Sequence, residues 1–214
     1  EVPEAYNNMG KVLDELRRCD ESITAYRDAL ALRPDYAVAY NNVGCSLIKV
    51  GRFEEAHASL SRAISINPDY DEAHFNLGNV LCDLGRYDEA VDNYRAAVSI
   101  NSGFAEAHDH LGSALKDMGR LEDALASYHQ ALALKPDYAK AHNGLGSTLK
   151  YMGQLDDAVF SYRQALALNP EFAEAHNNLA SALMSLGRQN EAIVSFRQAL
   201  AIKPDSTEAH SNLL

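Results

Sequence analysis

Histidine is the residue type in this 214-residue chain with the clearest potential for chemistry, because five histidines recur at intervals of 34 residues. They are His74, His108, His142, His176 and His210. A shared metal ion would need ring nitrogens about 2.0–2.1 Å away, whereas packed helices lie about 8–10 Å apart. One ion therefore cannot link the column. We interpret these histidines as packing residues, at the position that Tyr6 and Tyr40 fill earlier in the chain.

Motifs that carry catalysis are missing from the sequence. It has no glycine-rich phosphate loop, no serine elbow, no Cys-x-x-Cys pair and no recognisable frame of paired buried carboxylates. The sequence therefore predicts a chain that is not an enzyme and that needs no metal and no cofactor.

Asparagine forms two further columns with the same spacing. The first holds Asn8, Asn42, Asn76, Asn178 and Asn212, with His110 and Gly144 between them, and the second holds Asn7, Asn41, Asn143 and Asn177. Asparagine is unfavourable inside a helix because its amide competes with backbone hydrogen bonds. One amide offers donors and an acceptor, which match the main chain of an extended peptide. We predict that both columns and His110 contact a peptide or partner protein. The alternative is that the amides cap neighbouring helices or are solvated.

Charged residues on the same helices are mixed. Acids dominate the starts of these helices, whereas three lysines gather near the middle of the chain, namely Lys116, Lys140 and Lys150. Lys11 lies on the same helical face as Asn8. Our hypothesis is that the central lysines bind an acidic group of the partner. Ordinary solvated charge is the alternative.

The elements that position these columns follow from a repeat of 34 residues, the sign of a solenoid. The units run 3–36, 37–70, 71–104, 105–138, 139–172 and 173–206, and residues 207–214 begin a seventh unit. Each unit carries two stretches of helical apolar spacing, separated by a glycine in five units and by Arg17 in the first. The sequence predicts twelve helices in antiparallel pairs, the start of a thirteenth, and a single array over residues 3–206.

Residues at the helix ends and in the helix interiors predict where the helices end and how they pack. Proline ends most second helices because it cannot continue a helix, and acids such as Asp69 with Glu72 predict capping boxes for the helix that follows. A column of small residues that begins at Gly10 predicts close helix packing. Large residues fill the gaps: Tyr26, Leu60, Tyr94, Tyr128, Tyr162 and Phe196.

Composition narrows the class of partner. The formal net charge of −11 disfavours nucleic acid and anionic membranes, because both are bound mainly through Lys and Arg. No apolar run approaches the ~18 residues that a membrane span needs. The cysteines, Cys19, Cys45 and Cys82, are odd in number and irregularly spaced, which favours a reducing compartment. We therefore expect a cytoplasmic chain with a protein or peptide partner.

The repeat closely resembles the tetratricopeptide repeat (TPR) family. The fourth unit supplies the family pattern with His108, Leu111, Gly112, Ala124, Tyr128, Ala131 and Pro136. The resemblance implies an all-α, right-handed superhelical α-solenoid whose first helices line a concave face. The amino-acid sequence of the units is most similar to that of the repeat arrays in O-linked N-acetylglucosamine transferases and their bacterial relatives. That likeness implies a peptide-binding role for the first asparagine column, interrupted at His110 and Gly144.

A TPR subset that clamps the C-terminal carboxylates of chaperones is matched only in part. Asn79 and Lys140 fit that pattern, but Phe75, His110 and Gly144 do not. We therefore reject chaperone docking and keep Asn79 as a residue of the partner-binding face.

Three functions remain open. The leading hypothesis is a non-enzymatic interaction scaffold that binds a peptide or partner protein in the concave groove. The second is the substrate-recruiting arm of a larger glycosyltransferase. The third is self-association through an uncapped C-terminal end, because such arrays need polar terminal caps.

Overall fold

The computed structural model describes residues 2–205, and within this range it contains twelve α-helices and no strand. The first helices of the repeats are α1 (Pro3–Glu15), α3 (Ala37–Lys49), α5 (Asp71–Asp83), α7 (Ala105–Asp117), α9 (Ala139–Tyr151) and α11 (Ala173–Ser185). The second helices are α2 (Cys19–Leu32), α4 (Phe53–Ile66), α6 (Tyr87–Ile100), α8 (Leu121–Leu134), α10 (Leu155–Leu168) and α12 (Gln189–Ile202). The all-α repeat fold is confirmed. The predicted seventh unit, with His210 and Asn212, lies outside the described residues.

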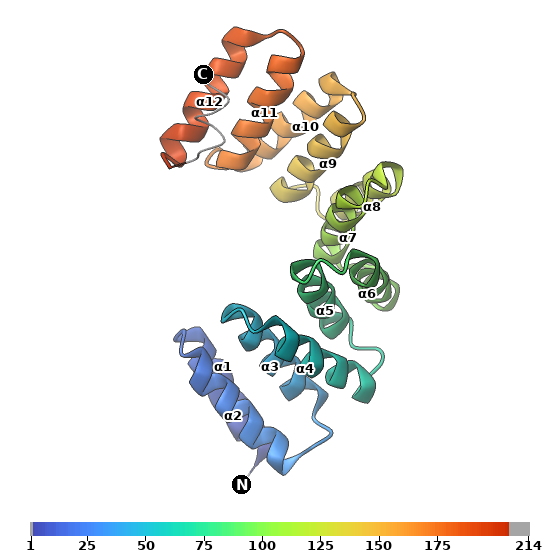
Figure 1. Ribbon diagram of the computed structural model, residues 1–214, viewed down its shortest axis with the longest axis vertical. Coiled ribbons are helices and arrows are strands. Elements are labelled where there is room, and N and C mark those ends of the chain that lie inside the picture. Colours follow the sequence, from blue (N-terminus) through green and yellow to red (C-terminus); the bar gives the residue numbers. More distant parts are fainter. Residues whose placement is uncertain (1, 206–214) are drawn as a thin grey trace. The chain divides into compact units, whose positions relative to one another are not determined.

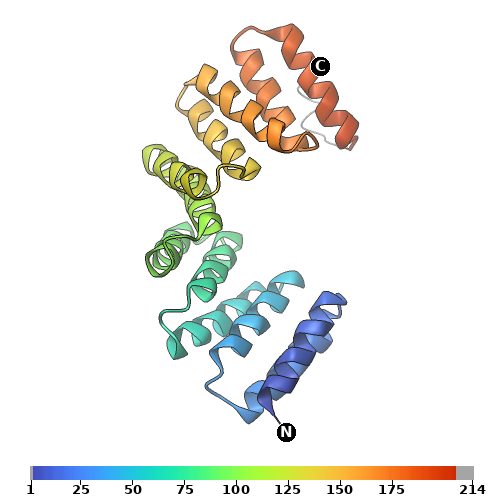
Figure 2. The same cartoon turned by 180° about the vertical axis from the view of Figure 1, so that it is seen from behind.

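Contacts between helices divide the chain into two compact units, Glu1–Ala107 and His108–Leu214. In unit 1, α1 pairs with α2, α3 with α4 and α5 with α6, and each pair packs on the next (Figures 1 and 2). In unit 2, α8 packs on α9, α9 on α10, α10 on α11 and α11 on α12. Each unit is thus a short solenoid of antiparallel helix pairs. Within a unit, successive first helices also touch, as α3 touches α5 and α9 touches α11.

The core of each unit consists of large side chains packed onto small residues. Tyr26, Tyr94 and Tyr162 are each 1% exposed. The ring of Tyr162 covers Gly146 so closely that a Cβ there would lie 2.8 Å from Tyr162 Cε1. The predicted columns of small and large residues therefore meet. They explain why the helices of a pair approach closely.

The turn inside each repeat requires the left-handed backbone region. Gly51 has φ 74°, and four further glycines at the same register have φ between 72° and 77°. In the first repeat Arg17 adopts φ 59°. A residue with a side chain is strained in this region, so the first turn is less favourable than the others, as the sequence predicts.

Arg17→Gly is expected to stabilise unit 1. Relief of left-handed strain is worth about 1–2 kcal/mol, and the entropy of glycine offsets roughly 0.5–1 kcal/mol of that gain. Equilibrium urea unfolding should therefore show a gain of about 0.5–1 kcal/mol. Gly51→Arg is the matched control and should lose a similar amount. A lower stability for Arg17→Gly would contradict this account of the turn.

The predicted capping boxes are wrong at the two described sites. The N-cap of α5 is Tyr70 and that of α11 is Phe172, and neither has a side-chain cap hydrogen bond. Asp69 lies one residue too early to cap α5, because the turn after the proline places the aromatic residue at the N-cap. The carbonyl of Tyr70 instead accepts from the backbone N–H groups of Ala73 and His74, both at 3.1 Å.

Candidate functional site

The two asparagine columns meet each other across neighbouring repeats. Asn42 Nδ2 donates to Asn7 Oδ1 at 2.9 Å, and Asn76 Nδ2 donates to Asn41 Oδ1 at 3.0 Å. In unit 2, Asn178 Nδ2 donates to Asn143 Oδ1 at 3.1 Å. We call each such pair, with partners 35 residues apart, an amide clasp. The clasps join successive first helices, so part of the asparagine signal has a structural cause that the sequence reasoning did not include.

The second column is the buried half of the clasps. Asn7, Asn41, Asn143 and Asn177 are only 2–6% exposed. Asn143 also donates from Nδ2 to Glu174 Oε1 at 3.0 Å. Burial raises the pKa of Tyr70 to about 12, and a hydrogen bond from Asn41 opposes that shift. These buried amides hold the first column in place, and a partner at the surface would meet the first column.

The first column keeps hydrogen-bonding capacity at the surface. Asn42, Asn76 and Asn178 are half-buried, and Asn8 is exposed. A side-chain amide has two N–H groups and one acceptor oxygen. The clasp uses one N–H of Asn42 and one of Asn178, and no other described group bonds to either amide. Asn76 also donates to Cys45 Sγ at 3.2 Å, which leaves its Oδ1 as an acceptor.

The clasps are interrupted where the columns change residue type. Phe75 replaces asparagine in the second column, and its ring packs against Phe104 with centroids 4.9 Å apart. Gly144 replaces asparagine in the first column. A Cβ at Gly144 would lie 2.4 Å from Tyr128 Cε1, because the Tyr128 ring occupies that space. The interruption at Gly144 therefore follows from packing.

The predicted lysines have different surroundings. Lys116 and Lys140 line a common pocket of about 240 Å³, whereas Lys150 Nζ donates to Ser181 Oγ at 2.6 Å. The pocket is also lined by Asp109, Ser113, Tyr128, Asn143, Gly144, Ser147, Phe172 and Glu174. Two further predicted contact residues lie in unit 1. Lys11 is exposed on α1, and Asn79 Oδ1 accepts from the Tyr94 hydroxyl at 2.8 Å.

The histidine column fastens the loops between repeats. Nε2 of His74, His142 and His176 lies 3.0–3.1 Å from the backbone oxygen of the proline six residues earlier. His74 Nδ1 also lies 3.1 Å from Asn93 Oδ1. Within residues 2–205, no group of His, Cys, Asp and Glu side chains is arranged to hold a metal ion. The sequence placed these histidines as packing residues, and the structure adds their bond to the loop.

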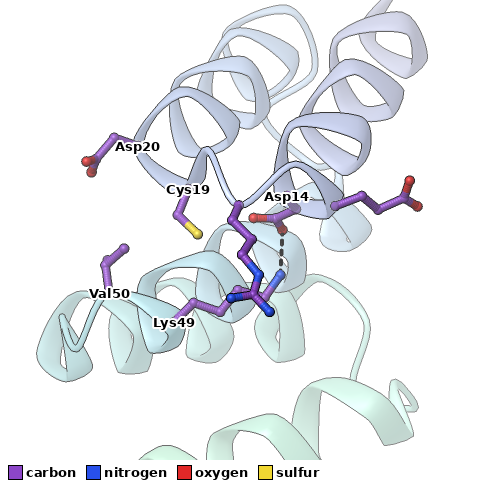
Figure 3. Close-up of a pocket in the computed structure, with 7 residues that line it drawn as sticks. Asp14, Cys19, Asp20, Lys49 and Val50 are labelled. Atoms are coloured by element: carbon purple, nitrogen blue, oxygen red, sulfur yellow. Dashed lines mark ion pairs between the residues drawn. The ribbon is translucent and has the colours of Figure 1, made fainter.

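Sequence reasoning missed a second hollow, which lies in unit 1 beside the Arg17 turn. It measures about 580 Å³ and is lined by Asp14, Glu15, Arg17, Cys19, Asp20, Lys49 and Val50 (Figure 3). Cys19 stands at the register that Phe53, Tyr87, Leu121 and Leu155 occupy in later repeats. A small side chain in a place usually filled by a large one explains the space.

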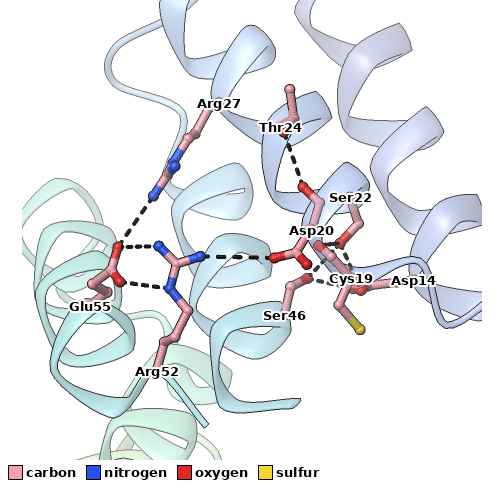
Figure 4. A network of polar contacts seen from close by, with 9 residues as sticks. All are labelled: Asp14, Cys19, Asp20, Ser22, Thr24, Arg27, Ser46, Arg52 and Glu55. Carbon is pink, nitrogen blue, oxygen red and sulfur yellow. Dashed lines mark hydrogen bonds and ion pairs between the residues drawn. The ribbon is translucent and has the colours of Figure 1, made fainter. Parts of the chain in front are cut away.

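Asp14, one of the lining residues, is held by neighbouring polar side chains. The carboxylate of Asp14 accepts from Ser22 Oγ at 2.9 Å and from Ser46 Oγ at 2.8 Å, and it lies 3.2 Å from Lys49 Nζ. These bonds link the first two repeats (Figures 3 and 4). Because a half-buried carboxylate with such partners is satisfied, we interpret Asp14 as a structural residue.

Charges at the starts of the second helices are also paired. Arg52 binds Glu55 at 2.6 Å and lies 4.0 Å from Asp20 (Figure 4). The hydrogen bond from Arg52 lowers the pKa of Glu55. Such exposed pairs contribute only about 0–1 kcal/mol. Because these charges on the second helices already have partners, the first helices remain the better candidate for a binding face.

Comparison with known proteins identifies the class of the chain. Models described as TPR repeat match residues 44–82, 78–119, 112–150 and 146–187, and models described as Tetratricopeptide repeat match residues 3–36 and 173–206. The chain belongs to the tetratricopeptide repeat family. Such repeat arrays present extended binding surfaces, and this chain is accordingly a protein-interaction scaffold. No curated protein matches it.

Solved structures show the same fold. PilW, a type IV pilus biogenesis factor, is 22% identical with a TM-score of 0.89, covering 99% of this chain and 98% of its own. MamA is 26% identical with a TM-score of 0.68, covering 78% of this chain and 97% of its own. YrrB, described as a TPR protein with an unusual peptide-binding site, is 24% identical with a TM-score of 0.69, covering 89% and 98%. Between residues 2 and 205, no helix combines the length and the apolar character that crossing a bilayer would require.

Proposed function

We propose that the chain binds an extended peptide segment of a partner protein along its first helices, through the first asparagine column. The observation that carries this proposal is the amide clasp. In the clasped pairs Asn42–Asn7 and Asn178–Asn143, one N–H fixes the amide and leaves an N–H and Oδ1 for a ligand. A peptide unit also has one donor and one acceptor, so each fixed amide matches the main chain.

The clasp favours peptide binding because an amide that is already fixed loses little further side-chain entropy. Immobilising a side chain on binding costs about 0.5–1.5 kcal/mol, and the clasp removes most of this cost before the peptide arrives. In unit 1 the clasps fix Asn42 and Asn76, and Asn8 is exposed at the same register, whereas in unit 2 a clasp fixes Asn178. The peptide-binding site named for YrrB supports this use of the fold.

The main-chain contacts alone support only weak binding. Each net hydrogen bond contributes about 0.5–1.5 kcal/mol, so the three first-column amides of unit 1, Asn8, Asn42 and Asn76, give roughly 1.5–4.5 kcal/mol. Association costs about 4 kcal/mol or more. Main-chain contacts alone are therefore expected to bind more weakly than millimolar, and tighter binding requires contacts with peptide side chains.

The test starts from peptides selected on the intact protein from a library of random sequences. Asn42→Ala is expected to weaken each selected peptide by about two- to tenfold, the loss of one net hydrogen bond. Methylation of single peptide N–H groups should weaken binding to a similar extent at alternate positions. Titration calorimetry or fluorescence anisotropy measures both effects.

Asn190→Ala is the matched control, because Asn190 is an exposed asparagine on a second helix. It should leave the affinity unchanged. Circular dichroism of Asn42→Ala must show intact helices, since the substitution also removes the bond to Asn7. If Asn42→Ala and peptide N-methylation both leave the affinity unchanged, the first column does not bind the main chain.

A further inference from the structure

Two departures from the repeat pattern coincide beside the first turn of unit 1. Arg17 takes the left-handed position that glycine holds in the later turns, with φ 59°. Two residues further on, Cys19 stands at a register that carries larger residues in the other described repeats, namely Phe53, Tyr87, Leu121, Leu155 and Gln189. The first departure strains the backbone and the second leaves space unfilled. Departures from local preference that gather in one place are expected at functional sites.

Both residues line the same hollow. It measures about 580 Å³, and its walls come from the end of α1, the start of α2 and the end of α3. Cys19 lines it from α2, and Val50 lines it from the C-cap of α3 (Figure 3). A cavity of roughly 150 Å³ already holds benzene, and ligand pockets measure about 300–1,000 Å³. The hollow therefore has room for a ring and for the groups attached to it.

The register of Cys19 indicates which kind of side chain fits this space. In four of the other described repeats the residue there is large and apolar, and in two of them, at Phe53 and Tyr87, it is aromatic. Phe53 is half-buried. The fold therefore accommodates a ring between a turn and the end of the next first helix. In the first repeat the chain itself does not supply that ring.

The charges around the hollow favour a neutral aromatic ring over an ion. Three acids and two cations line it, and Lys49 already lies 3.2 Å from Asp14. Arg17 is exposed, and among the described residues no carboxylate forms an ion pair with it. A guanidinium stacks favourably on an aromatic face. Glu15 and Asp20 are exposed acids, which can accept a hydrogen bond from a phenol hydroxyl.

We propose that this hollow binds a tyrosine side chain of a partner protein, with Cys19 and Val50 against the ring and Arg17 over its face. The site is separate from the first asparagine column, because Lys49 lies about 10 Å further along α3 than Asn42. The proposal therefore goes beyond the proposed function and does not depend on it.

The test uses p-cresol, which is the tyrosine side chain as a free molecule, and the peptide acetyl-Gly-Tyr-Gly-amide. Binding is followed by NMR shifts of the Cys19 and Val50 backbone amides. Both probes should bind in the millimolar range, the strength expected of such small ligands. The compound 4-methylcyclohexanol keeps the hydroxyl and lacks the aromatic face. It should bind about two- to fivefold more weakly than p-cresol.

Three variants locate the effect. Cys19→Phe places a ring in the hollow, as at Phe53, and should weaken both probes by at least about tenfold. Arg17→Gln should weaken p-cresol about two- to fivefold and leave 4-methylcyclohexanol unchanged. Arg62→Gln is the matched control, because Arg62 is an exposed arginine on α4, and it should bind p-cresol as the parent does. Circular dichroism must show intact helices in each variant.

Three results would overturn the proposal. Shifts that are missing in the parent, or Val50 shifts that persist in Cys19→Phe, exclude the hollow as the site. Equal binding of p-cresol and 4-methylcyclohexanol excludes recognition of the aromatic face. Binding of p-cresol without binding of the peptide means that the hollow accepts a free small molecule and not a partner's side chain. None of these results bears on the first asparagine column, which the Asn42→Ala test judges separately.

Discussion

Tyr162→Ala is expected to lower the free energy of unfolding by about 3–5 kcal/mol, as measured for other buried aromatic side chains replaced by alanine. The ring is 1% exposed and packs directly over Gly146. Because glycine has no side chain that could move into the space, the cavity cannot close from that side. Guanidinium unfolding followed by circular dichroism measures the loss. Hydrogen exchange should localise it to α9 and α10.

Tyr162→Phe is the matched control for this prediction. It keeps the ring and removes only the hydroxyl bond to Ser147 Oγ, which is 3.3 Å long. The cost should be about 0.5–1.5 kcal/mol, and Phe196 fills the same register in the next repeat without a hydroxyl. If Tyr162→Ala cost no more than Tyr162→Phe, the ring would not be the residue that holds the pair together.

Asn143→Ala is expected to destabilise unit 2 by about 1–3 kcal/mol, because it removes the shared partner of two polar groups. Asn143 accepts from Asn178 and donates to Glu174. Truncation leaves the amide of Asn178 and the carboxylate of Glu174 without this partner. Asn143 is only 6% exposed. Chemical unfolding measures the loss, and the change should concentrate where α9 packs on α11.

Asn177→Ala provides the comparison at the same register. Among the described residues, Asn177 Oδ1 is a buried atom without a hydrogen-bond partner. The 35-residue spacing of the clasps predicts Asn212 as its donor, and Asn212 lies outside the described residues. A cost for Asn177→Ala well below that of Asn143→Ala is expected if no clasp forms there. Equal costs would indicate that Asn177 has a partner of the same kind.

The asparagine columns show how far the sequence could predict the site. Their recurrence marked the first helices as unusual, and the structure places Asn8, Asn42, Asn76 and Asn178 where a ligand can reach them. Their shared spacing predicts the same role for both columns, although the second column is buried. Neighbouring positions on a helix differ by about 100° in direction. How the repeats stack decides which of these two positions points toward the next repeat.

The same limit applies to the loops and the lysines. An acid after proline resembles a helix cap, but the turn geometry put Tyr70 at the N-cap of α5. Lys116 and Lys150 share a register in successive repeats, yet one lines a pocket and the other binds Ser181. Side chains of this length choose partners from residues that are distant in sequence. The pattern of residue types along the sequence therefore does not predict which partner each lysine contacts.

The sequence by itself determined the repeat, the two helices of each unit and the columns that fill the core. These features depend on local preferences, on the left-handed turn at Gly51 and its equivalents, and on a period that recurs in every unit. Only the tertiary structure decided that the asparagines clasp each other and that Tyr128 lies against Gly144. The physical reason is that hydrogen bonds and close packing join atoms of different repeats, whose distances are fixed only when the helices stack.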